Sequence, residues 1–191
     1  MKNARFVLPV LFAAACSGGE PAPADAFMNA LRAHCGQAYE GRVVSSDPAD
    51  ADFAGQRLVM HVRSCADTEI RIPFHVGEDR SRTWVVTRTD AGLRLKHDHR
   101  HEDGSEDVVT QYGGDSSAIA SAKRVEFPVD GYSIDLFNRE GLTASVVNVW
   151  ALEIDDQTFA YELSRENRFF RAEFDLADAV ETPPAPWGAA E

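Results

Sequence analysis

The sequence lacks several features that would assign a function at once. No apolar run reaches the roughly 18 to 20 residues that a membrane-spanning helix needs. It contains no Gly-x-Ser-x-Gly, His-Glu-x-x-His, phosphate-binding loop or Cys-x-x-Cys motif. Basic residues are scarce, with 19 Lys and Arg against 31 Asp and Glu, and the resulting net charge of −12 repels phosphate. We therefore expect no partnership with nucleic acid.

The overall composition is typical of one globular domain. The chain has 191 residues, of which 44% are hydrophobic and 26% are charged. These values argue against wholesale disorder and against a coiled coil. The length suits one domain, or two very small ones, with a substantial core.

The first 15 residues are typical of an export signal. Lys2 and Arg5 precede an apolar stretch, residues 6–15, which is too short to span a membrane and has the size of a signal-peptide core. We interpret residues 1–15 as a signal peptide.

The segment that follows resembles the bacterial lipobox, in residues 13–16 (AAAC). In that pattern Cys16 receives a diacylglyceryl group and the chain is cleaved in front of it, although Leu is preferred where Ala13 stands. A Ser directly after the lipidated Cys, here Ser17, resembles the class of lipoproteins that is sorted to the outer membrane. The resemblance implies a lipoprotein on the periplasmic face of the outer membrane, anchored in the membrane by its lipid. The alternative is ordinary cleavage after Ala15, which gives a soluble periplasmic or secreted protein.

The number of cysteines favours lipidation. The chain has three, Cys16, Cys35 and Cys65, and an exported protein with an odd number keeps a loose thiol. If Cys16 carries lipid, Cys35 and Cys65 are left to form a disulfide, which would stabilise the fold by about 3–4 kcal/mol on the chain-entropy model. Residues 16–24, rich in Gly, Pro and Ala, are expected to be the tether.

A short helix is predicted at the start of the mature domain. Asp25 is placed to cap it, Phe27, Met28 and Leu31 share one face, and the helix is expected to reach His34.

After this helix the hydrophobic pattern has a period of two, which is typical of strands with one buried face. The predicted strands are Gly41–Ser45, Arg57–Arg63, Glu69–Val76, Thr83–Thr89, Gly92–His101, Glu106–Tyr112, Lys123–Phe127, Ser133–Phe137, Ser145–Ile154, Thr158–Ser164 and Arg168–Asp175. In this pattern His61 and His75 fall on outward faces.

Short turns between these strands require antiparallel neighbours. A meander of about ten strands exposes long edges unless it curls, so the sequence predicts a mainly β fold: an antiparallel up-and-down barrel over residues 25–180. A two-sheet sandwich is the alternative. Residues 181–191 are expected to form a Pro-rich tail in which Trp187 is the only residue suited to docking on the domain.

Two resemblances support this fold. Residues 36–41 (GQAYEG), after a short helix, resemble the entry to lipocalin-like (calycin) barrels, which begin with a Gly-x-aromatic element. Residues 53–63, 72–88, 93–104 and 148–154 resemble an uncharacterised family of exported proteins of Gram-negative bacteria. This second resemblance implies export and a single domain, and it brings no activity.

A row of histidines is the one group of residues in the sequence whose spacing is suited to metal binding. Period two places His97, His99 and His101 on the inward face with Leu93 and Leu95. Neighbouring imidazoles on a strand are about 6.6 Å apart, so His97 and His99 are able to share one zinc or copper ion.

A carboxylate from across the next turn, Asp107 or Glu106, would complete such a site. The alternatives are a polar lining of the barrel mouth and a role in sensing acid.

The aromatic residues are the other candidates for function. Trp84, Phe127, Phe137, Trp150, Phe159, Tyr161, Phe170 and Phe174 are predicted to fill the barrel. Some of them are alternatively the lining of an apolar ligand cavity. Because no catalytic group is organised in the sequence, we favour a non-catalytic module that binds a small apolar or amphipathic molecule or serves envelope maintenance. A metal-binding protein or metal-dependent enzyme that uses the histidine row is the alternative.

Overall fold

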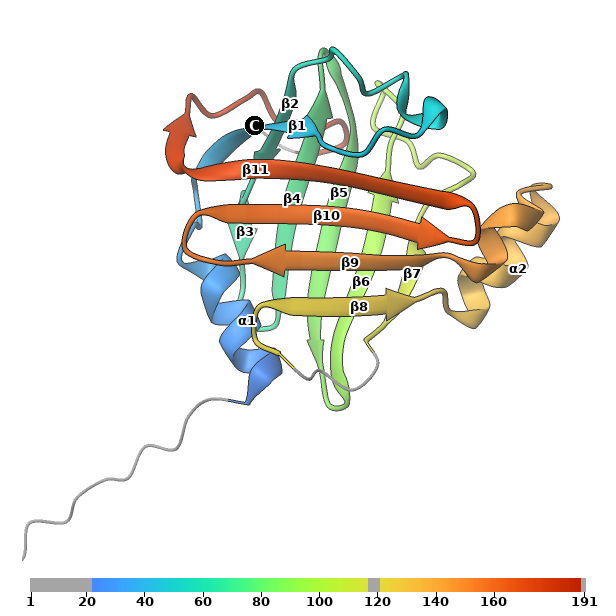
Figure 1. Ribbon diagram of the computed structural model, residues 1–191, viewed down its shortest axis with the longest axis horizontal. Helices are drawn as coiled ribbons and strands as arrows, with labels where there is room; N and C mark the ends of the chain where they lie inside the picture. The colour runs from blue at the N-terminus through green and yellow to red at the C-terminus, as the bar shows by residue number, and fades with distance from the viewer. Residues whose placement is uncertain (1–21, 117–120, 190–191) are drawn as a thin grey trace, which may run out of the picture.

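The computed structural model describes residues 22–116 and 121–189. In this part of the chain one antiparallel sheet curls into a nearly closed barrel (Figure 1). The strands are β1 (Ala38–Val43), β2 (Leu58–His61), β3 (Ser64–Cys65), β4 (Glu69–Val76), β5 (Asp79–Thr89), β6 (Gly92–His99), β7 (Tyr112–Asp115), β8 (Arg124–Pro128), β9 (Val149–Ile154), β10 (Thr158–Arg165) and β11 (Arg168–Val180). The helices are α1 (Pro23–Arg32), α2 (Gly131–Arg139) and the 3-10 helices η1 (Pro48–Asp50) and η2 (Thr143–Val147).

Most strands that follow one another in the chain also pair with one another in the barrel. The order around the wall is β7-β6-β5-β4-β2-β1-β11-β10-β9-β8, and the short β3 pairs with β4 beside this path. The first strand pairs with the last one, with Ala38 opposite Val180 and Val43 opposite Ala172. The predicted antiparallel barrel is confirmed.

The one gap in the wall lies between β7 and β8, the two ends of this strand order. Backbone groups come close here, since the amide of Asp130 donates to the carbonyl of Gly113 at 2.9 Å. A Cβ on Gly114 would meet the carbonyl oxygen of Pro128, so only glycine fits at this position. Gly113 and Gly114 both belong to β7.

The predicted strand Ser133–Phe137 is wrong, because these residues belong to α2. The side chain of Asp130 caps this helix by accepting from the amide of Ser133 at 2.9 Å. Ser133, Leu136 and Phe137 are its buried positions, and their spacing of three and four is that of a helix face.

Two further strand predictions need correction. Residues 106–111 form an irregular connection, since β7 begins only at Tyr112 and Glu106 makes a single isolated bridge to Arg100. In the predicted strand Ser145–Ile154, residues 145–147 belong to η2, and β9 begins at Val149.

Helix α1 covers one end of the barrel, and α2 lies on the opposite side (Figure 1). Phe27 and Leu31 of α1 are fully buried. The helix begins at Pro23, inside the expected tether, and Asp25 does not cap it; instead the Asp25 carboxylate accepts from Arg88 of β5 at 2.7 Å. None of the described helices is long and apolar enough to cross a membrane.

The predicted disulfide joins Cys35, just after α1, to Cys65 in β3, with the two Cα atoms 6.2 Å apart. This bond fastens the segment after the helix to the barrel wall. Cys16 and the proposed signal peptide lie outside the described residues.

The C-terminal tail docks on the outer face of the barrel. The amide of Trp187 donates to the carbonyl of Arg80 at 3.1 Å. Pro183 and Pro184 share a depression with His75, which is buried rather than exposed on its outward face. His61 is also buried, so neither of these two outward-facing histidines is exposed to solvent.

Candidate functional site

The candidate site is a cavity inside the barrel, towards the end away from α1. It has a volume of about 350 Å³, within the usual range for small-molecule sites. Most of its wall is aromatic. The aromatic side chains that line it are Phe53, Phe74, Trp84, Tyr112, Phe137, Trp150, Tyr161 and Phe170. All eight aromatic residues predicted to fill the barrel are buried, and five of them line this cavity.

Strand alternation builds this wall in layers. On β5, Val86 lies in the core and Trp84 and Arg82 line the cavity. On β10, Tyr161, Leu163 and Arg165 line it in turn. Residues two apart on a strand face the same side, so on both strands the inward side chains change from apolar and aromatic residues to an arginine.

β6 shows the same gradient with histidine in place of aromatic residues. Leu93 and Leu95 are fully buried in the core, and His97 and His99 line the cavity. The inward placement of these two histidines follows the predicted register. His101 lies beyond the end of β6 and is exposed, so the row does not continue to the third histidine.

Both ring nitrogens of His97 are engaged in hydrogen bonds. Its Nδ1 lies 3.2 Å from the carbonyl oxygen of Tyr112, which only accepts, so Nδ1 donates there. Its Nε2 then accepts from the hydroxyl of Tyr161 at 2.9 Å. The ring also stacks on Tyr112, with centroids 4.6 Å apart. These contacts fix the tautomer and leave neither nitrogen open for a metal ion.

Burial keeps both inward histidines neutral. Only 3% of His97 is exposed, and burial, with the neighbouring His99 as a smaller cause, lowers its pKa to about 3. Burial followed by the charge of Arg82 lowers the pKa of His99 to about 4. The Nε2 atom of His99 lies 3.2 Å from the hydroxyl of Tyr112, whose pKa burial raises to about 12.

Of the two carboxylates expected beside the histidines, one lies at the cavity and the other lies on the surface. Asp107 lines the cavity, and its charge acts on His99. Glu106 is exposed and pairs with Arg100 at 3.0 Å. Within residues 22–116 and 121–189, no group of three or more His, Cys, Asp and Glu side chains is placed to hold a metal ion. The arrangement of these side chains therefore gives no support to a zinc or copper site.

Three arginines at the cavity were not identified from the sequence. Arg82 pairs with Asp79, and Arg168 pairs with Asp50 at 2.5 Å and with Asp47 at 3.3 Å. Arg165 donates to the amide oxygen of Asn148 at 3.0 Å.

Two of these arginines could have been identified from the alternation of the sequence. Arg82 and Arg165 continue the inward parity of their strands by one step beyond the predicted strand ends.

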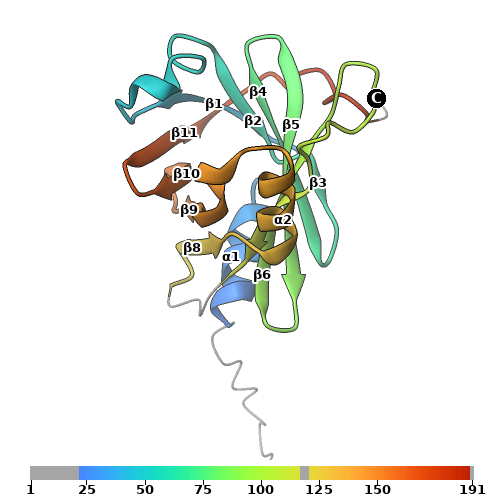
Figure 2. The same cartoon turned by 90° about the vertical axis from the view of Figure 1, so that its right-hand side faces the viewer.

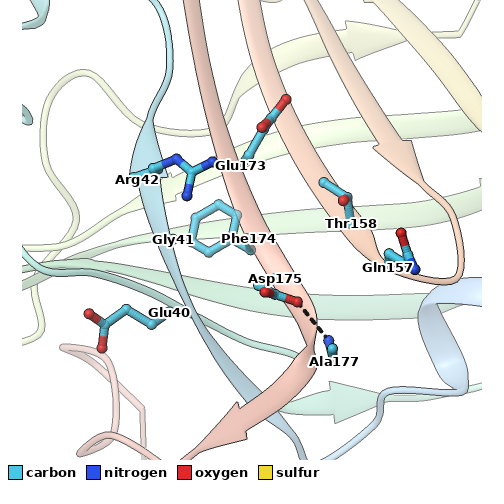
Figure 3. Close-up of a pocket in the computed structure, with 9 residues that line it drawn as sticks. All are labelled: Glu40, Gly41, Arg42, Gln157, Thr158, Glu173, Phe174, Asp175 and Ala177. Carbon is cyan, nitrogen blue, oxygen red and sulfur yellow. Dashed lines mark hydrogen bonds between the residues drawn. The ribbon is translucent and has the colours of Figure 1, made fainter.

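A second depression, of about 560 Å³, lies on the outer face of the wall (Figure 3). It forms where β11 bulges away from β1, since Tyr39 pairs with Ala179 while Gly41 pairs with Phe174. Its charged lining consists of Glu40, Arg42, Glu173 and Asp175. This depression is open and polar, so the inner cavity is the better candidate for a ligand.

The cavity offers stacking surfaces and hydrogen bonds rather than an activated nucleophile. Burial raises the pKa of Tyr161 well above its usual value, so its hydroxyl stays protonated beside a neutral His97. No protein-family model matches this chain, and neither a curated protein nor a solved structure matches it.

Proposed function

We propose that this protein is a non-catalytic binding module that holds one small amphipathic molecule inside its barrel and is tethered to the periplasmic face of the outer membrane by a lipid on Cys16. The cavity of about 350 Å³ is the observation that carries the binding role. Aromatic walls supply apolar contact area at low cost in side-chain entropy, and a polar rim orients the bound molecule.

The layered lining supports an amphipathic ligand in particular. The deep part of the wall is formed by Trp84, Trp150 and Tyr161, and the cationic side chains come from the strand ends at the mouth. A molecule with an apolar body and a polar end matches this gradient. The export signal and lipobox resemblance of residues 1–16 support the location.

Two fluorescent probes test the binding role. N-phenyl-1-naphthylamine and its sulfonated relative 8-anilino-1-naphthalenesulfonate share an aromatic body of suitable size and brighten when water is excluded. We expect at least one of them to saturate a single site on the mature protein.

A pair of neighbouring valines provides the matched variants. Val109 lines the cavity, whereas Val108 is 65% exposed. Val109→Trp places an indole in the cavity and is expected to weaken probe binding by about ten-fold or more, equivalent to about 1.4 kcal/mol. Val108→Trp should bind as the wild type does. Equal binding by Val109→Trp and wild type, in a folded variant, would contradict binding inside the barrel.

A further inference from the structure

One corner of the cavity presents hydrogen-bond donors without matching acceptors. It consists of Ser145 on η2, Asn148 just after η2 and Arg165 at the end of β10, and we call these three residues the donor corner. All three line the same cavity.

The arginine of this corner differs from the other two at the cavity. Arg82 and Arg168 are neutralised by carboxylates, as described above. Arg165 has no carboxylate within 4.0 Å among the described residues, and its one side-chain hydrogen bond there goes to a neutral amide. Most of its guanidinium donors are left for another acceptor.

The orientation of Asn148 follows from this contact. A guanidinium only donates, so the amide oxygen of Asn148 must face Arg165 and the NH2 group must point elsewhere. Asn148 is only 4% exposed, and its NH2 group meets no acceptor in the described part of the chain. The Ser145 hydroxyl also makes no hydrogen bond to another described side chain or backbone group.

Among the described residues, Asp107 is the one acidic side chain that lines the cavity. It comes from the connection between β6 and β7, whereas Arg165 comes from β10. Across the gap, two strands, β8 and β9, separate β7 from β10. Its Oδ1 accepts from the amide of Val109 at 2.7 Å. Asp107 therefore does not neutralise the donor corner.

From these contacts we infer that the ligand is an amphipathic acid: an aromatic body with one carboxylate-like or sulfonate-like group, whose oxygens bind the donor corner. This inference rests on the proposed function and names its ligand class. Guanidinium binds such groups through two parallel charge-assisted hydrogen bonds. The body then lies on aromatic walls in which Trp84 stacks with Phe74 at 4.7 Å and with Tyr161 at 4.6 Å between ring centroids.

The two probes introduced above differ in the group that the donor corner would bind. Wild-type protein is expected to bind the sulfonated probe about ten-fold more tightly than the neutral one. Arg165→Met keeps the length of the side chain and removes the charge. It should weaken binding of the sulfonated probe by about ten-fold or more and change binding of the neutral probe by less than about three-fold.

Arg42→Met is the matched control, because Arg42 is exposed on the outer face of β1 beside the depression in Figure 3. It should bind both probes as the wild type does. Thermal melting confirms that each variant is folded.

The outcomes separate the two proposals. If neither probe saturates a site on the wild type, the proposed function itself fails. If the wild type binds both probes equally, or if Arg165→Met weakens both to the same extent, the barrel still binds small molecules but the inferred acid group is wrong.

Discussion

His97 is a polar residue that contributes to the barrel in its neutral form. Its ring lies among Tyr112, Trp150 and Tyr161, and both of its nitrogens have partners. A charged imidazolium at this place would lose its hydration without gaining a carboxylate contact. The fold is therefore coupled to the protonation state of this residue.

The first prediction concerns the pH dependence of stability. The pKa of His97 falls from 6.5 to about 3 in the folded protein, so the unfolded chain binds the proton more readily. Its contribution to stability is complete above pH 6.5 and falls by about 1.4 kcal/mol for each pH unit below that value, until the folded pKa is reached. Between pH 7.5 and 4.5, His97→Gln should lose about 2–3 kcal/mol less of its unfolding free energy than the wild type. Urea unfolding at the two pH values measures this.

His101→Gln is the control for this experiment, because the His101 side chain is exposed. It should follow the wild-type decline. An identical decline in His97→Gln and wild type would show that His97 is not the group that takes up the proton.

The sequence predicts part of this site. The alternation that begins at Leu93 and Leu95 places His97 and His99 inside the barrel. It can be read from the sequence because the face on which a strand residue lies depends only on its position along that strand. The neutralising partners of Arg82 and Arg168, and the lack of one at Arg165, depend on which distant segments meet. His75 lines one depression together with the docked tail, and no local sequence pattern indicates this contact.

At the scale of elements, the strands with long, strict alternation are predicted correctly, and the errors fall on short or irregular segments. The five residues 133–137 satisfy the strand period and the helix period nearly equally. The cap at Asp130 decides for the helix, and the helix places Phe137 in the cavity. Residues 106–111 contain two consecutive valines rather than a strict alternation, and they form no ladder because β7 pairs with β6 only from Tyr112 onwards.

The gap between β7 and β8 leads to the second prediction. Gly114→Ala forces a methyl group against the carbonyl of Pro128, so the two strands must separate. We expect a loss of about 1–3 kcal/mol in unfolding free energy, the usual cost of overpacking. Chemical denaturation measures it.

Gly131→Ala is the comparison, because a Cβ at Gly131 meets nothing within 4 Å. It should change stability by no more than about 0.5 kcal/mol. If both variants were equally stable, the close approach at Gly114 would not matter for the fold.

At the scale of the whole molecule, the third prediction concerns the tether. Cys35 and Cys65 are joined to each other, which leaves Cys16 as the one cysteine outside the disulfide. If Cys16 carries the lipid, Cys16→Ser should move the protein from the membrane fraction to the soluble fraction, with its barrel intact. Fractionation followed by immunoblotting checks this. A wild-type protein found mainly in the soluble periplasmic fraction would instead support cleavage after Ala15.

The pairing of β1 with β11 has a consequence for the order in which the molecule is completed during synthesis. The β1 residues that pair with β11 have partners more than 125 positions later in the chain, as Val43 does with Ala172. While the chain is being made, β1 can pair with β2, but its other edge stays open until residues 172–180 have emerged. Closure of the barrel is therefore a late event dominated by distant contacts, which form slowly. A growing chain has no complete cavity, and the capacity to hold a ligand arises only when the last strand is added.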